Sequence, residues 1–176
     1  MPSLNDLTAG TWTVDPAHSE LSFSVRHLMV AKVRGKFADF TGAVEVGAPA
    51  TDSTVTATVQ LASVDTGSAD RDTHLKSPDF FDTEKNPEMT FVSTSVTDGA
   101  LVGDLTIKGV TKPVTFDVEF NGVAADPWGN TKAGFEAETE INRTDWGLTW
   151  NAAIEGGGVL VAEKVKITLD IELLKG

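Results

Sequence analysis

Apolar residues recur at every second position through most of this 176-residue chain. Side chains along a β-strand point alternately to its two faces, so a period of two is typical of strands that are buried on one side. The runs from Leu21 to Val25 and from Val165 to Leu173 show the alternation most clearly. The pattern predicts an all-β protein that forms a single domain over residues 1–176.

Glycine and proline residues separate the alternating runs, at the places where hairpin turns would connect neighbouring strands. Asp98-Gly99 predicts a tight hairpin, and Asn121-Gly122 is predicted to begin a longer connection that extends to Asn130. Successive hairpins favour an up-and-down antiparallel sheet of about eight strands that closes into a barrel. A barrel of that size either packs solid or holds one small ligand. The pattern by itself leaves both alternatives open.

One run changes its phase at Ala38-Asp39. Val33 and Phe37 occupy odd positions, whereas Phe40 occupies an even one. A β-bulge would keep the apolar face continuous across this shift. Two short strands joined by a kink would do the same, and we favour the bulge.

Two segments lack the alternation and are predicted to lie outside the strands. Residues 66–87 have helix-like spacing around Leu75 between proline stops, which predicts one short helix followed by a loop. Residues 143–158, which end in Gly156-Gly157-Gly158, are predicted to form a second long loop, with the glycines beside the barrel mouth. Trp146 and Trp150 in this loop could form an aromatic lid over a ligand or belong to the core, and we favour the core.

Charge and cysteine content exclude several classes of function. The net charge of −12 disfavours binding to nucleic acids and to anionic membranes. No apolar run approaches the roughly 20 residues that span a bilayer, and the N-terminus lacks the basic start and apolar core of a signal peptide. We therefore expect a cytoplasmic protein without stable membrane insertion. The absence of cysteine excludes disulfides, thiol catalysis and cysteine-based zinc sites.

The large apolar side chains favour a hydrocarbon as the ligand of such a barrel. The chain has nine Phe, four Trp, three Met and no Tyr, and a lining with few hydroxyl groups suits a hydrocarbon better than a sugar or nucleotide. Alternation fixes which residues share a strand face, but not which face is inside. The residues that we expect to line the pore are Phe23, Val25, Phe37, Phe40, Phe80, Phe81, Met89, Phe91, Leu105, Phe116 and Phe135.

Five blocks of sequence, in order and covering nearly the whole chain, resemble the YceI-like family of polyisoprenoid-binding, lipocalin-like proteins. They are WTVDPAHSELSFSVRH from Trp12, VRGKFADFTG from Val33, ADRDTHLKSPDFFDTEKNPEMTF from Ala69, GDLTIKGVTKPV from Gly103 and AGFEAETEINRTDWG from Ala133. The resemblance implies an extended, eight-stranded antiparallel barrel with a long apolar pore. It also implies a bound polyisoprenoid or isoprenoid-quinone-type lipid, no other cofactor, and often a homodimer.

Several polar residues are candidates for contacts to a lipid headgroup at the pore mouth. Arginine binds oxyanions and quinone oxygens well, because its guanidinium presents several fixed donors. The alternative is that Arg71-Asp72 and the Arg143 segment tie the two long loops to the barrel wall. The headgroup candidates are Arg26, Arg71, His74 and Arg143.

No catalytic or metal-binding motif is evident. His18, His27 and His74 do not pair at ligand spacing, so we expect structural hydrogen bonds, or a headgroup contact, in place of a metal site. The chain also lacks Gly-x-Ser-x-Gly. We therefore expect a lipid carrier or sequestering protein and not an enzyme. The alternatives are an enzyme that acts on a small apolar or amide substrate at the pore mouth, and a solid-cored interaction protein that serves stress responses.

A homodimer would need a contact made by loops or outward side chains, because a closed barrel has no free strand edge. Leu28, Met29 and Val30 are adjacent apolar residues outside the clean alternation. Three exposed apolar neighbours would suit a two-fold contact. The alternative is a short helical turn that covers one end of the barrel.

Overall fold

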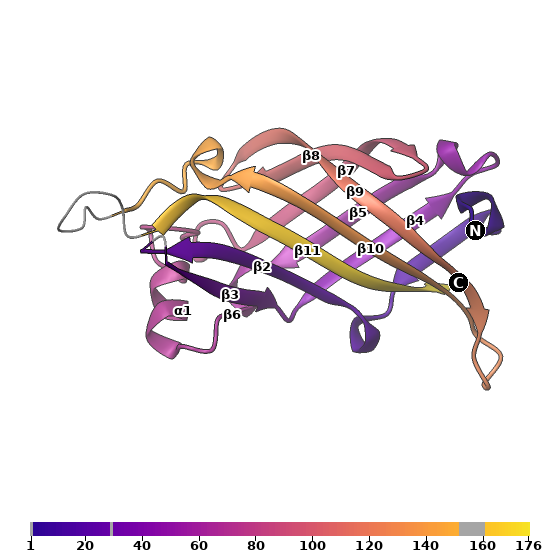
Figure 1. Ribbon diagram of the computed structural model, residues 1–176, viewed down its shortest axis with the longest axis horizontal. Coiled ribbons are helices and arrows are strands. Elements are labelled where there is room, and N and C mark those ends of the chain that lie inside the picture. Colours follow the sequence, from indigo (N-terminus) through magenta and orange to yellow (C-terminus); the bar gives the residue numbers. More distant parts are fainter. Residues whose placement is uncertain (1, 29, 152–160) are drawn as a thin grey trace.

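The computed structural model describes residues 2–28, 30–151 and 161–176. Its main feature is one antiparallel sheet that closes on itself, because β1 pairs with β11 as well as with β4 (Figure 1). The strands are β1 (Gly10–Val14), β2 (Glu20–His27), β3 (Ala31–Phe37), β4 (Phe40–Val46), β5 (Thr54–Gln60), β6 (Val64–Asp65), β7 (Glu88–Thr97), β8 (Ala100–Ile107), β9 (Val110–Ala125), β10 (Thr131–Asn142) and β11 (Val161–Lys175). Helix α1 spans Ala69–Lys76, and short 3-10 helices span Leu4–Asp6, Pro16–His18, Ala50–Asp52, Leu61–Ser63 and Arg143–Trp146.

The eleven strand segments form eight long strands, because three of the long strands are interrupted. β1 and β2 pair with successive parts of β11 and are divided by the 3-10 helix Pro16–His18. β3 and β4 are divided by Ala38 and Asp39, and β5 and β6 by the 3-10 helix Leu61–Ser63. The predicted eight-stranded, up-and-down antiparallel barrel is confirmed.

The phase change at Ala38-Asp39 is a kink between two short strands, so the bulge prediction is wrong. A bulge inserts one extra residue into a ladder that continues on both sides. Here the neighbouring long strands are interrupted at the same level, so the regular ladder stops. The backbone of the kink instead bonds to the adjacent break, with Ala38 N donating to Ser63 O at 3.4 Å and Gln60 N donating to Asp39 O at 2.9 Å.

The prediction that Asn121-Gly122 begins a connection is also wrong, because both residues lie inside β9. Gly122 pairs with Gly134 and Phe120 pairs with Phe135, so Asn121 is an extra residue that makes a β-bulge. Gly122 has φ of 118°, which glycine adopts without strain. The hairpin turn follows only where β9 ends.

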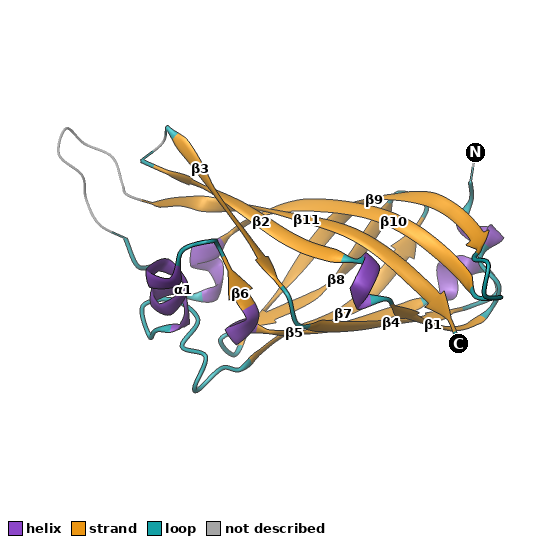
Figure 2. Ribbon diagram, turned by 90° about the horizontal axis from the view of Figure 1, so that it is seen from below, coloured by secondary structure: helices purple, strands orange, loops and turns teal. Residues whose placement is uncertain are grey.

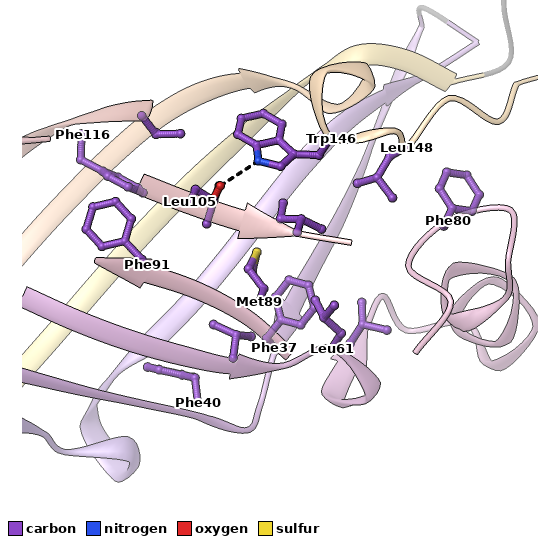
Figure 3. Packing of buried hydrophobic residues seen from close by; sticks show 14 of the residues in the cluster. Phe37, Phe40, Leu61, Phe80, Met89, Phe91, Leu105, Phe116, Trp146 and Leu148 are labelled. Carbon is purple, nitrogen blue, oxygen red and sulfur yellow. Dashed lines mark hydrogen bonds between the residues drawn. The ribbon is translucent and has the colours of Figure 1, made fainter. Parts of the chain in front are cut away.

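Buried apolar side chains form two clusters within the barrel. The larger one includes Trp146, which is 3 % exposed and whose indole N–H donates to Leu105 O at 2.9 Å (Figure 3). The prediction that Trp146 belongs to the core is therefore correct. The smaller cluster lies at the end of the barrel that holds the chain termini (Figure 1), and its members are Leu4, Leu7, Trp12, Val46, Ala50, Ala133 and Leu173.

Helix α1 covers the opposite end of the barrel (Figure 2), and the predicted short helix is confirmed. The Ser68 hydroxyl caps it by accepting from Arg71 N. Asp70 and Asp72 in the first turn complement the positive end of the helix dipole. Among the described residues, no helix combines the length and the apolar character that crossing a bilayer requires.

Candidate functional site

A cavity of about 670 Å³ runs through the inside of the barrel. Its lining includes Leu4 and Leu7 near the chain termini, and Arg71 and His74 on α1 at the other end. The volume lies within the range of ligand sites in proteins, roughly 300–1,000 Å³. This space is inconsistent with the alternative of a solid-cored barrel.

Strand alternation determines which side chains face the cavity. On β2, Phe23, Val25 and His27 belong to the lining, whereas Ser24 and Arg26 do not. All eleven residues expected at the pore lie along this cavity, nine of them on strands and Phe80 and Phe81 in the segment after α1, although their role in binding stays a prediction. They are Phe23, Val25, Phe37, Phe40, Phe80, Phe81, Met89, Phe91, Leu105, Phe116 and Phe135.

Among the described lining residues, charged and imidazole side chains occur at one end of the cavity only. The described lining residues that are charged or carry an imidazole all come from the end covered by α1 (Figure 1). We call this group the polar end, and its members are His27, Asp70, Arg71, His74 and Arg143. The opposite end is lined by apolar residues such as Leu4, Leu7, Ala50 and Leu173.

Arg143 is the buried charge of the polar end, with only 4 % of its surface exposed. Its guanidinium donates to four backbone carbonyls, those of Leu148 (2.6 Å), Trp150 (3.0 Å), Ala162 (2.9 Å) and Val161 (3.2 Å). Burial lowers the pKa of this guanidinium. The nearby negative charge of Glu163 acts in the opposite direction and raises it. Four of its five N–H donors are thus used to hold the segment after β10 against the start of β11.

His74 lies within an aromatic cluster at the same end. Its ring centroid is 4.6 Å from Trp150 and 5.1 Å from Phe80, and both contacts are edge to face. Its Nε2 lies 2.9 Å from a carboxylate oxygen of Asp79. Trp150 is half-buried and packs against the larger apolar cluster, as the favoured assignment to the core expects, and it also lines the cavity. Arg143 adds a cation at 5.9 Å from the centroid of the Phe80 ring.

Arg71 and Asp72 both bind Thr66 and do not pair with each other. Arg71 Nε donates to Thr66 Oγ1 and its Nη2 to Thr66 O, both at 2.8 Å. Asp72 accepts from Thr66 N at 2.9 Å and from the Thr66 hydroxyl at 2.6 Å. The expectation that Asp72 ties a loop to the barrel fits this geometry, whereas an Arg71–Asp72 ion pair is absent from the described contacts. Two of the five N–H donors of Arg71 are used in the described contacts.

Arg26 does not lie at the polar end, which corrects the expectation that it contacts a headgroup there. It is exposed and absent from the cavity lining. The reason is the period of two, since Val25 and His27 on either side of it point inward.

A further polar cluster joins residues that are far apart in the sequence. His18 Nδ1 lies 2.8 Å from Asp15, and the Lys132 ammonium lies 3.2 Å from Asp15 and 2.7 Å from Glu172. Hydrogen bonds from His18 and Lys132 lower the pKa of Asp15, and hydrogen bonds to Glu172 and Asp15 raise that of Lys132. Asp15, His18 and Glu172 are close enough to hold a metal ion, but the Lys132 ammonium already supplies positive charge to both carboxylates. Sequence analysis missed this cluster because Glu172 comes from the other end of the chain.

The expected dimer contact is described only in part. Leu28 is 39 % exposed and Val30 is 81 % exposed, at the tip of the β2–β3 hairpin. Met29 and the three glycines from Gly156 to Gly158 lie outside the described residues.

Comparison with known proteins gives a consistent match. The YceI-like domain matches residues 12–173 of the chain. A UPF0312 protein of Staphylococcus epidermidis is 44 % identical over 162 residues, which cover 90 % of this chain and 94 % of that protein. A UPF0312 protein of Staphylococcus aureus is 46 % identical over 164 residues, covering 92 % and 95 %.

Solved structures show the same architecture. Burkholderia cenocepacia BcnA superposes with a TM-score of 0.73 at 25 % identity, covering 90 % of this chain and 98 % of that one. A YCEI protein of Campylobacter jejuni superposes with a TM-score of 0.72 at 30 % identity, and the match covers 86 % of this chain and 90 % of that one. A polyisoprenoid binding domain from Saccharophagus degradans gives 0.72 at 13 % identity, covering 94 % and 98 %, and shares the fold alone. With a domain match over nearly its whole length and relatives above 40 % identity, the chain belongs to the YceI-like family.

Proposed function

We propose that this protein binds a long-chain polyisoprenoid or isoprenoid-quinone-type lipid and carries or sequesters it. The tail would occupy the apolar length of the cavity, and the polar head would lie at the polar end. The observation that carries the proposal is that the described charged side chains gather at one end of a mostly apolar cavity, which suits a ligand with one polar terminus. The polyisoprenoid binding domain of Saccharophagus degradans has the same fold and so gives further support.

The energetics of the apolar part favour a long tail. Burying one CH₂ group is worth about 0.8 kcal/mol. A tail of roughly ten carbons would therefore gain on the order of 8 kcal/mol before the cost of ordering it is subtracted. Few polar contacts are then needed, which fits a lining that is mostly hydrocarbon.

Arginine donors at the polar end support a head that carries acceptor oxygens. Arg143 makes no ion pair with a described carboxylate within 4 Å, so its buried charge is held mainly by carbonyl dipoles, with a longer-range contribution from Glu163. In the described contacts, one donor of Arg143 and three of Arg71 make no hydrogen bond. A hydroxyl, quinone or phosphate oxygen would use them.

We propose binding and not catalysis, and the lipid is the sole ligand in this proposal. The support for binding is the mostly apolar lining of the cavity and the absence of a recognisable catalytic motif in the sequence. A cytoplasmic location stays a prediction.

The test is extraction of the purified protein followed by mass spectrometry, and titration with isoprenoid alcohols of increasing length. We expect a co-purified isoprenoid, and an affinity that rises with chain length until the cavity is full. If mass spectrometry detects no isoprenoid in the extract and none of these alcohols binds, the proposal is refuted. A turnover that is lost in His74→Ala would favour the enzyme alternative.

A matched pair of variants places the ligand inside the barrel. Ala137 lines the cavity and is 9 % exposed, so Ala137→Phe puts a ring where the tail would lie. Ala124 is exposed on β9, and Ala124→Phe adds the same ring to the surface. We expect Ala137→Phe to weaken binding at least tenfold and Ala124→Phe to leave it unchanged. Equal affinities for the two variants would place the ligand elsewhere.

A further inference from the structure

The β2–β3 hairpin has an unusual charge for this protein. From Glu20 to Phe37 the hairpin contains four of the 14 lysines and arginines of the chain and one of its 26 carboxylates, Glu20 at its base, although the net charge is −12. The four cations are Arg26, Lys32, Arg34 and Lys36, and all four are exposed. We call them the basic strip.

Strand register places the basic strip on the outer face of the hairpin. Arg26 is directly opposite Lys32, and Ser24 is opposite Arg34. Like charges directly opposite each other in a sheet repel. Arg26, Lys32 and Arg34 form no ion pair with any described carboxylate.

The strands beside the strip carry charges of both signs, including Glu163 on β11 near Arg26. Lys36 is opposite Asp65 on β6, so this cation has an acidic neighbour. On the other side, Lys166 of β11 is opposite Ser24 and is already paired with Glu138 at 3.4 Å. The cations without an ion pair among the described residues, Arg26, Lys32 and Arg34, therefore lie in the half of the hairpin nearest its tip.

The tip of the same hairpin is apolar. Val30 is 81 % exposed and Leu28 is 39 % exposed. Figure 2 shows that this tip stands apart from α1. Apolar side chains ahead of a set of cations form the arrangement with which peripheral proteins enter the headgroup region of a bilayer.

The inner face of the hairpin lines the cavity. Val25, His27 and Val33 belong to the lining, and His27 is part of the polar end. Lysines on a strand edge also discourage aggregation, which accounts for Lys32 on β3 but not for Arg26 on β2 or for the apolar tip.

We propose that the basic strip and the apolar tip dock the barrel on an anionic lipid bilayer, with the polar end of the cavity facing that surface. This inference rests on the proposed function, because a bilayer is where an isoprenoid lipid is taken up or delivered. A second copy of this chain fits the face less well. A two-fold contact would bring the same cations of both copies together.

The experiment measures co-flotation with vesicles of phosphatidylcholine, with and without one third phosphatidylglycerol. We expect binding to the anionic vesicles that weakens at high salt. Each Lys or Arg near an anionic surface contributes about 1 kcal/mol, so Lys32→Glu/Arg34→Glu should weaken binding on the order of 30-fold or more. Val30→Ser in the parent protein should also weaken binding to anionic vesicles. The size of this loss should be the same at low and high salt.

The matched control is Lys112→Glu/Lys175→Glu, which alters the net charge equally at exposed lysines outside the hairpin. We expect it to bind anionic vesicles nearly as well as the parent protein. An equal loss in both double variants would overturn the proposal, since net charge alone would explain it. No preference of the parent for anionic vesicles would do so as well. So would a dimer by light scattering that Lys32→Glu/Arg34→Glu dissociates, because a second copy would then cover this face.

One rival surface is tested directly. Trp128 is 83 % exposed at the β9–β10 turn, and an exposed tryptophan can itself anchor a protein at a bilayer. Loss of vesicle binding in Trp128→Ser, with retention in the Lys32→Glu/Arg34→Glu variant, would move the docking surface there and overturn the proposal.

Two further measurements separate this proposal from the proposed function. The Lys32→Glu/Arg34→Glu variant should still bind an isoprenoid alcohol added without vesicles, and Ala137→Phe should still bind anionic vesicles. Vesicle binding by a parent protein that takes up no isoprenoid would support docking while refuting the lipid cargo. The reverse result would refute docking alone.

Discussion

Replacing Arg143 by methionine should show how much one buried guanidinium stabilises the polar end of the cavity. The variant keeps much of the side-chain volume and removes four hydrogen bonds to carbonyls at 2.6–3.2 Å. Hydrogen bonds from a charged donor are worth about 1.5–3 kcal/mol each. Burying this charge costs several kcal/mol of desolvation that no described ion pair offsets, and the methionine variant avoids that cost. The net loss in the free energy of unfolding should be about 3–5 kcal/mol.

Urea unfolding followed by tryptophan fluorescence measures this loss, and two variants bracket it. Arg143→Lys keeps the charge but offers three donors from a single atom, so it should fall between Arg143→Met and the parent. Lys164→Met is the control, because Lys164 is 75 % exposed and lies 3.7 Å from the exposed Glu140. Its effect should stay within about 0.5 kcal/mol. A loss below about 1 kcal/mol in Arg143→Met would refute the reasoning.

Two other sites allow sharp predictions. Trp146→Phe removes the donor to Leu105 O from a buried site, which should cost about 1–3 kcal/mol in urea unfolding, and an unchanged midpoint would contradict it. Asp15→Asn should destabilise at neutral pH, because the lowered pKa of Asp15 means that the folded state favours the carboxylate beside His18 and Lys132. This stabilisation is present above the usual pKa of 3.8 and is lost as the pH falls through the lowered value. The difference in Tm between parent and variant should therefore shrink below about pH 4, and a constant difference would argue against it.

Much of the barrel follows from local sequence signals. The alternation of Phe23 and Val25 with Ser24 fixes which side chains share a face, because side chains along a strand have a period of two. The Asp98-Gly99 pair marks a tight turn in the same local way, and the structure places it between β7 and β8 with Gly99 at φ of 93°. The five ordered blocks add the family and therefore the closed barrel.

The misplaced elements share one physical cause. Asn121-Gly122 has the composition of a turn, but a glycine with positive φ serves a bulge equally well, and the pairing of β9 with β10 selects the bulge. The kink at Ala38-Asp39 depends on breaks in two neighbouring strands, which no window around residue 38 contains. Local conformation is therefore ambiguous wherever the cross-strand partner decides it.

The sequence by itself determined the fold class, the composition of the two strand faces and the family. Only the tertiary structure decided that the apolar faces enclose a cavity, that Arg26 lies outside it, and that Arg143 is buried at one end. Only the tertiary structure shows, too, that Lys132 forms ion pairs with both Asp15 and Glu172. The physical reason is that strand periodicity is a property of neighbouring residues, whereas barrel closure joins segments that are far apart in the chain.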